Sequence, residues 1–305
     1  MDQIQKHMLE EIADLHEIPE GAYNIRSNGE SAGRRSTENI EIVPKEDKPG
    51  IDIIIKPGTK KESVHIPVIV SKSGLKDLTY NDFFIGEDSD VVIVAGCGIH
   101  CGGDDTTAHD GIHTFHLAKG ARVKYVEKHY GEGEGKGDRV LNPVTNIIQD
   151  ADSYFEMETV QIKGVTSTKR DTKAVLGDRA TLIIKEKIMT NEKQYAETNF
   201  EVELNGEDCH TDVVSRSVAR DESYQIFHSN IIGNNKCVGH SECDGILMDQ
   251  GRVVAVPSLD AANLDASLIH EAAIGKIAGE QLIKLMTLGL TEEEAEEQIV
   301  NGFLK

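Results

Sequence analysis

Residues 236–245 read KCVGHSECDG and concentrate side chains that bind metal ions or carry out thiol chemistry. Cys237 and Cys243 bracket His240, Glu242 and Asp244 in this stretch, and the chain has five cysteines in all. Thiolate, imidazole and carboxylate groups are the usual protein ligands of transition metals. A free cysteine can also be a nucleophile or a small apolar core residue. The residue types therefore leave three explanations open: a metal site, a reactive thiol, or packing.

A second pair of cysteines, Cys97 and Cys101, follows the apolar run VVIVAG. The spacing of this pair is C-x3-C, and the spacing of Cys237 and Cys243 is C-x5-C. Zinc ribbons use the tighter C-x2-C spacing, so neither pair is a standard zinc knuckle. A closed zinc site is disfavoured by the spacing but stays an alternative.

Three histidines, His109, His113 and His116, lie at i, i+4 and i+7 in TTAHDGIHTFH. On a helix they would share one face and could hold one ion. Gly111 and the neighbouring threonines argue against a stable helix. We therefore expect surface histidines here and keep a metal site as the alternative.

The sequence HEAAI at 270–274 begins like the helix of a zinc protease. That motif needs a second histidine four residues after the first, and Ile274 occupies this place. The protease reading fails, but His270 and Glu271, next to an expected helix start, could still bind a metal ion. A solvated polar pair is the alternative.

Composition narrows the classes of partner. The chain has 305 residues, 38% of them hydrophobic, no Trp, and a net charge of −21. So acidic a surface repels nucleic acid and anionic lipid, and it favours a basic protein partner or metal cations. The N-terminal residues lack a signal peptide pattern and no apolar run could span a membrane, which predicts a cytoplasmic protein with reduced cysteines.

Short β-branched runs such as IDIII, VHIPVIV and ATLIIKEKIM follow one another between residues 51 and 258. Amphipathic helical windows are rare between these runs, which excludes alternating βαβ units and leaves a sandwich, a barrel or a β-helix. Several runs are almost continuously apolar, as in parallel strands buried on both faces, and this favours the β-helix. A helix is expected over 2–16, and the polar residues 27–50 are expected to form a linker or surface loop.

Two helices are expected at the end of the chain. The first covers 279–288 and stops at Gly289. The second follows the capping box TEEE at 291–294 and carries an apolar stripe of Ala295, Ile299 and Phe303. The apolar faces of this hairpin either pack on the β core or dock a partner, and the residues alone favour packing.

The stretch SECDGILM, followed by LIHEAAIGKIAGEQLIKLMTLGLTEEEAEEQIVNGFL, resembles the SufB/SufD family of iron–sulfur cluster assembly proteins. Upstream, VVIVAGCGIHC and ARVKYVEKHYGEGEGKG are similar to further segments of that family, so the resemblance covers roughly 60–305. It implies a mainly β fold, a right-handed parallel β-helix with helical termini. The implied division is an N-terminal helix and linker over 1–50, a β-helix core over 51–262, and a helical ATPase-docking segment over 263–305.

The resemblance also implies a role for four residues. Cys97 matches the SufB-like cysteine that receives sulfur. Cys243 matches a proposed cluster ligand of SufB, and Glu271 matches the glutamate beside it. His270 matches the histidine that SufD presents across the dimer interface. Because one chain carries both halves of this set, the resemblance implies a homodimer with a transient iron–sulfur cluster at its interface.

The implied function is a scaffold rather than an enzyme, with ATP hydrolysis in a SufC-like ABC ATPase bound to the C-terminal helices. A sulfur donor and recipient apoproteins are the other implied partners. Two alternatives stay open: a zinc-dependent enzyme that uses Cys97 and Cys101 with nearby histidines, and a structural β-helix adaptor without metal.

Overall fold

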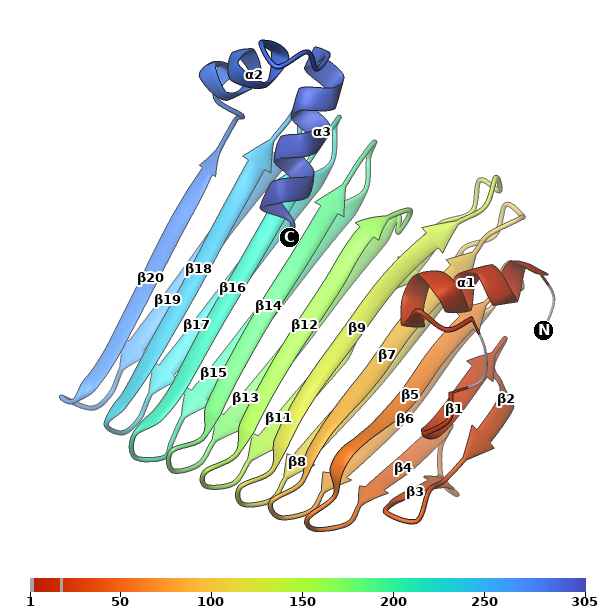
Figure 1. Cartoon of the computed structure of the whole chain (residues 1–305), viewed down its shortest axis with the longest axis vertical. Helices are drawn as coiled ribbons and strands as arrows, with labels where there is room; N and C mark the ends of the chain where they lie inside the picture. The colour runs from red at the N-terminus through yellow and green to blue at the C-terminus, as the bar shows by residue number, and fades with distance from the viewer. Residues whose placement is uncertain (1–2, 17–18) are drawn as a thin grey trace.

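The computed structural model describes residues 3–16 and 19–305, which form a β-solenoid of about eight turns with a helix at each end (Figure 1). Helix α1 covers Gln3–Ala13, α2 covers Gly279–Met286 and α3 covers Glu292–Phe303. The strands are β1 (Ala22–Ser27), β2 (Glu30–Arg35), β3 (Ile40–Pro44), β4 (Gly50–Ile55), β5 (Lys60–Val70), β6 (Lys76–Ile85), β7 (Asp90–His100), β8 (Thr107–Leu117), β9 (Arg122–Glu132), β10 (Arg139–Leu141), β11 (Val144–Gln149), β12 (Tyr154–Lys163), β13 (Ser167–Leu176), β14 (Thr181–Thr190), β15 (Tyr195–Leu204), β16 (Cys209–Ala219), β17 (Tyr224–Gly233), β18 (Cys237–Leu247), β19 (Arg252–Ala261) and β20 (Ala266–Gly275). The expected β-helix is confirmed.

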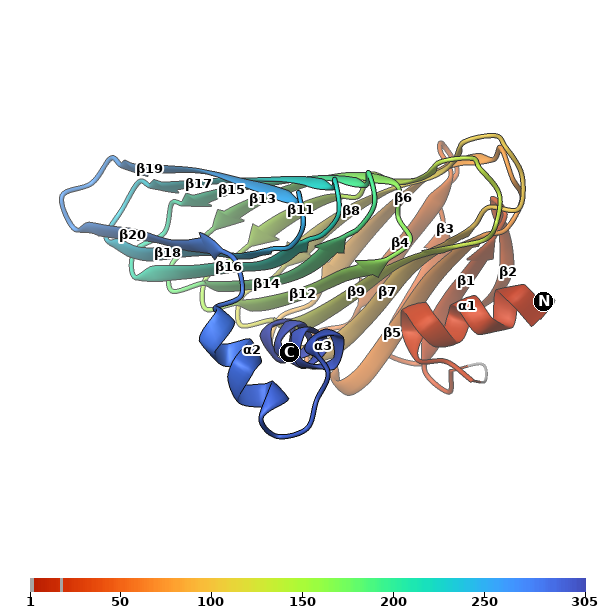
Figure 2. The ribbon, with the colours of Figure 1, turned by 90° about the horizontal axis from the view of Figure 1, so that it is seen from above.

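The strands form two sheets that face each other (Figure 2). Sheet A has the order β2-β1-β5-β7-β9-β12-β14-β16-β18-β20, and sheet B has the order β19-β17-β15-β13-β10-β8-β6-β4-β3, with β11 between β8 and β13. From β4 onward, successive coils add strands to both sheets in the same direction, so neighbouring strands are parallel, whereas the pairs β1/β2 and β3/β4 are antiparallel. From β4 onward, ladder partners on adjacent coils are 27 to 33 residues apart in the chain.

Alternation along each strand separates the core from the surface. In β12, for example, Phe155 and Met157 are buried and Glu156 and Glu158 are half-buried on the outer face. The period of two is the ordinary consequence of strand geometry. The core between the sheets is built mainly from Ile, Val, Leu and Phe, with one polar region that is described below.

Residues 27–50 were expected to be a linker, and the structure corrects this expectation. Strand β2 pairs antiparallel with β1, and β3 pairs antiparallel with β4. Asn28 and Gly29, both with positive φ, make the turn of the first hairpin. Asn-Gly is the strongest short hairpin signal in a sequence. The hairpin was missed because β2, at an edge of sheet A, is polar and lacks the apolar pattern expected of a strand.

The C-terminal end of the solenoid is open. Strands β19 and β20 are the last strands of their sheets, and β20 extends the solenoid beyond the expected boundary at residue 262, as far as Gly275. His270 and Glu271 therefore lie in a strand and not beside a helix start. Helix α3 begins with the expected capping box of Thr291 and Glu294.

The terminal helices differ in how they pack. In α3, Val300 is buried against Val218 and Met248 on the outer face of sheet A. Helix α2 has no buried residue. No helix in the described part of the chain is long and apolar enough to cross a bilayer.

Helix α1 packs on the outer face of β5, β7 and β9 (Figure 1). Its buried side chains Met8 and Ile12 meet β7 at Gly96 and Gly98. A Cβ atom at Gly96 would lie 2.6 Å from the Ile12 carbonyl oxygen. The two glycines thus let α1 approach the strand directly behind Cys97.

The substitution Gly96→Ala should lower the free energy of unfolding by about 1–3 kcal/mol, because the added methyl group forces α1 away from β7. The matched control is Gly302→Ala in α3, where nothing lies within 4 Å of the added carbon. This control should leave the stability unchanged or raise it by up to about 1 kcal/mol. Chemical denaturation of both variants is the measurement, and equal stabilities would contradict the close packing of α1.

Candidate functional site

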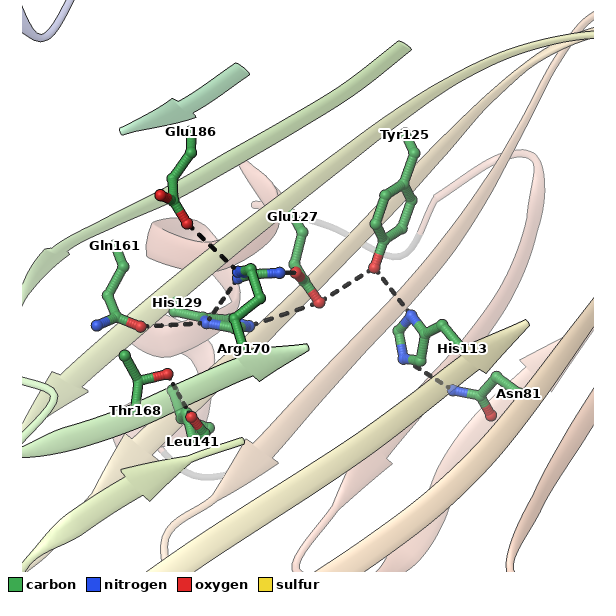
Figure 3. Close-up of polar contacts among 10 residues, drawn as sticks. All are labelled: Asn81, His113, Tyr125, Glu127, His129, Leu141, Gln161, Thr168, Arg170 and Glu186. Atoms are coloured by element: carbon green, nitrogen blue, oxygen red, sulfur yellow. Dashed lines mark hydrogen bonds and ion pairs between the residues drawn. The ribbon is translucent and has the colours of Figure 1, made fainter. Parts of the chain in front are cut away.

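A polar region crosses the interior between the two sheets. Arg170 on β13 of sheet B reaches Glu127 on β9 of sheet A, with Nη1 2.6 Å from Oε2 (Figure 3). Its Nε lies 3.8 Å from Oε1 of Glu186 on β14. All three residues are at most 3% exposed. Buried charges are tolerated when they are paired in this way.

The two carboxylates respond differently to Arg170. Burial alone would raise the pKa of Glu127, but Arg170 and His129 hold it well below its usual range. Burial raises the pKa of Glu186, and Arg170 only partly opposes this. Glu186 also accepts hydrogen bonds from Ser215 at 2.7 Å and Thr198 at 3.3 Å.

A hydrogen-bonded chain leads from Glu127 to β8 (Figure 3). The Tyr125 hydroxyl donates to Glu127 at 3.1 Å and lies 2.8 Å from Nδ1 of His113. Burial lowers the pKa of His113 to about 4, so its ring is neutral at neutral pH. Nδ1 of His113 then carries the proton that bonds Tyr125, and the Asn81 amide donates to Nε2 at 3.4 Å.

Cys97 lies next to this region on the inner face of β7 and is 6% exposed. Its neighbour in the parallel ladder is His129 on β9. His109 on β8 of sheet B interacts with the same sulfur across the interior. Burial alone would raise the pKa of the Cys97 thiol, but His109 and His129 lower it to about 7.

His109 is held by a second ion pair. Its Nδ1 lies 3.0 Å from Oδ2 of Asp77 on β6, and Arg26 on β1 donates to both carboxylate oxygens of Asp77 at 3.1 and 2.7 Å. Burial lowers the pKa of His109, whereas Cys97 and Asp77 raise it, to about 10. The pKa of His129 is raised to about 9, chiefly by Glu127 against the effect of burial.

Cys243 lies in the interior at the other end of the solenoid. It is on β18 beside Ser215 of β16, is fully buried, and belongs to the main core. Burial, with smaller effects of Glu186 and Asp244, raises the pKa of Cys243 to about 12. At neutral pH its sulfur is therefore a thiol.

His270 and Glu271 lie on opposite faces of β20. The ladder pairs His270 with Ser241 and Glu271 with Glu242, while Cys243 pairs with Ala272. His270 thus belongs to the inner set with Cys243, and Glu271 is exposed on the outer face. Neither ring nitrogen of His270 has a hydrogen-bond partner of normal geometry among the described residues. Within residues 3–16 and 19–305, no group of three or more His, Cys, Asp or Glu is arranged to hold a metal ion.

Two expectations on the histidines of 109–116 are corrected. They lie on a strand, so they cannot share a metal ion through helical spacing. His109 and His113 point into the core, whereas surface positions were expected. His116 is on the outer face, where it stacks on Phe84.

The other cysteines make local contacts. All five are free and buried. Cys209 and Cys237 are ladder neighbours in the apolar core, and the pKa of each is raised, first by burial. Cys101 donates to the Gly103 carbonyl at 3.4 Å in the loop after β7.

Sequence reasoning singled out His109 but expected it on the surface, and it missed the other polar residues around Cys97: Asp77, Glu127, His129 and Arg170. A signal was present. Asp77 and His109 are 32 residues apart, which is one coil in this part of the chain, and Cys97 and His129 have the same separation in the ladder. Aligning the chain on itself at that period would have brought the acid, the imidazoles and the thiol together.

Comparisons with known proteins agree with this architecture. A family model described as the SufBD core domain of SUF system FeS cluster assembly matches residues 78–303. An iron–sulfur cluster assembly SufBD family protein of Methanothermobacter thermautotrophicus is 29% identical over 261 residues, 84% of this chain and 62% of the relative. One of Archaeoglobus fulgidus is 30% identical over 273 residues, 88% of this chain and 71% of the relative. The chain thus spans about three fifths of the length of the Methanothermobacter relative. On the extent of these matches, the chain belongs to the SufBD family of iron–sulfur cluster assembly proteins.

Proposed function

We propose that the protein is a scaffold on which sulfur received at Cys97 is combined with iron near Cys243, His270 and Glu271, where two copies of the chain meet. The observation that carries this proposal is the polar interior that joins the two cysteines. Between Cys97 and Cys243 lie His129, Glu127, Arg170, Glu186 and Ser215, each in contact with the next or beside it in a ladder.

The difference between the two cysteines supports the direction of this transfer. The pKa of Cys97 is about 7, so its thiolate is available as a sulfur acceptor. The pKa of Cys243 is about 12, so Cys243 keeps its proton until a metal ion displaces it. A mixed set of thiolate, imidazole and carboxylate ligands holds a cluster less tightly than four thiolates, which suits a cluster that must be passed on.

The open end of the solenoid supports the dimer. The outer edges of β19 and β20 have no partner strand in the described chain. Leu259 and Ile274, near this end, are partly exposed. Free sheet edges with apolar side chains pair readily with another chain. A second copy of this end would cover the core and complete the site around Cys243 and the unpartnered His270. Glu271 would reach the metal around the free edge of β20.

Replacing Cys243 tests the cluster site. Cys243→Ala should abolish the visible absorbance and the bound iron and sulfide of protein reconstituted without oxygen, because it removes the soft ligand. Cys237→Ala on the same strand is the matched control and should keep the chromophore, since Cys237 only packs in the core. An unchanged spectrum of Cys243→Ala would favour an adaptor without metal at this position. Stoichiometric zinc without a chromophore would favour the zinc enzyme.

Helix α2 is the proposed docking surface for an ABC ATPase of the SufC kind, which would supply ATP hydrolysis. Its exposed apolar side chains are Ile283 at 63% and Met286 at 42%, and Leu288 after the helix is 77% exposed. Lone exposed apolar residues are common, but two on one projecting helix and a third in the turn after it form a contact patch. ATP binding would then favour one arrangement of the two copies over another.

The double variant Ile283→Glu, Leu288→Glu should weaken capture of the co-expressed ATPase at least about tenfold, because two charges would be desolvated in the contact. Val175→Glu, an exposed position on the outer face of sheet B, is the control and should bind like the unmodified chain. Pull-down at equal protein concentrations gives the comparison. Undiminished binding of the double variant would place the docking surface elsewhere.

A further inference from the structure

Among the described residues, two imidazoles influence the sulfur of Cys97. His109 approaches from β8 across the interior, and His129 lies beside Cys97 on β9. The other groups packed around Cys97 are apolar: Val68, Val70, Ile99, Leu141 and Val165. The outer face of β7 at this point is covered by α1.

The ring of His109 is oriented by groups on its far side. Nδ1 bonds Asp77, which is itself fixed by the two-pronged contact with Arg26. Nε2 has no hydrogen-bond partner among the described residues, and His109 is 2% exposed. Nδ1 bonds Asp77, so Nε2 is the ring nitrogen that is free to accept the proton of Cys97. A nucleophile, a base and a group that orients the base form the arrangement of activated nucleophiles in general.

We propose that Cys97, His109 and Asp77 form a nucleophilic triad, with His129 as a second imidazole that holds the thiolate, and that the triad accepts sulfur from a persulfide. Cys97 is the nucleophile, His109 is the base, and Asp77 and Arg26 are positioning residues. The role in sulfur acceptance rests on the proposed function, whereas the triad itself does not.

The transfer step is balanced without an oxidant. His109 takes the proton of the Cys97 thiol, and the thiolate attacks the terminal sulfur of a persulfide R–S–SH. The S–S bond of the donor breaks as the new S–S bond forms, and R–S⁻ leaves. The proton held by His109 passes to R–S⁻. The products are the Cys97 persulfide and the thiol R–SH, so no atom or electron is left over.

The position of the triad limits what can reach it. Val68, which pairs with Cys97 in the ladder, and Arg26 both line a small cavity of about 30 Å³ near the N-terminal end of the solenoid. A volume of that size holds about one or two water molecules, and Cys97 and His109 do not line it. The sulfur of Cys97 is itself buried, which favours a donor that presents only its terminal sulfur over a bulky thiol reagent.

The test is the titration of the Cys97 thiolate by its far-ultraviolet absorbance, measured as the difference between the unmodified protein and Cys97→Ser. The expected midpoint is about 7. In His109→Gln and in Asp77→Asn the midpoint should rise to the ordinary thiol value of about 8.5 or above, which lowers the thiolate fraction at neutral pH more than about tenfold. His116→Gln, on the outer face of the same strand, is the matched control and should leave the midpoint unchanged.

Two results would overturn the triad: a midpoint at or above about 8.5 in the unmodified protein, or a midpoint that His109→Gln and Asp77→Asn do not move. The midpoint of the unmodified protein tests the triad whether or not the variants fold. Incubation with cysteine persulfide and mass spectrometry adds a functional readout, in which His109→Gln should form the Cys97 persulfide more slowly than the control His116→Gln. The titration needs no iron. If the protein assembles no cluster but the Cys97 midpoint stays near 7 and rises in the variants, the proposed function is rejected and the triad is kept.

Discussion

A charge inside a β-solenoid survives only beside a charge of opposite sign, and this constraint organises the interior of the protein. From the N-terminal end, starting at the partly buried Arg26, the groups alternate in sign: Arg26, Asp77, His109, Cys97, His129, Glu127, Arg170 and Glu186. The members come from both sheets, so the series ties the two faces together. Removing one member would leave its neighbours buried without compensation, which typically costs about 3–5 kcal/mol.

The series also gives the two inner cysteines different chemistry in one core. Cys97 sits between two imidazoles and has a pKa of about 7, whereas Cys243 sits beyond the last arginine, near a carboxylate, and has a pKa of about 12. Burial raises the pKa of both thiols, so the cationic neighbours make the difference. A reactive sulfur at one end and a protonated ligand at the other suit a scaffold that receives sulfur before it receives iron.

The sequence allowed the fold to be predicted where the residues carry a local signal. The apolar runs gave the strands, and Thr291 with Glu294 gave the start of α3. The prediction was wrong where pairing with strands distant in the sequence overrode a local pattern. His270 was expected near a helix start because HEAA favours a helix, yet ladder pairing with β18 makes it a strand. The polar strand β2 was taken for part of a linker despite the Asn28-Gly29 turn.

The site was only partly predictable for a different reason. Cys97 and Cys243 could be selected by resemblance, but the groups that set their pKa values come from other coils. From β4 onward, coil length varies between 27 and 33 residues, so the register that brings His109 to Cys97 cannot be read from a fixed repeat. The buried pair of Arg170 and Glu127 looks like two ordinary surface charges in the sequence for the same reason.

The most direct test of the alternating series is nitrogen NMR of the histidine rings at neutral pH, with His109 and His129 assigned by substitution with glutamine. The pKa values of about 10 for His109, about 9 for His129 and about 4 for His113 predict two charged rings and one neutral ring in the same core. Neutral rings at both His109 and His129 would contradict the account, because Cys97 would then have no cation to hold its thiolate.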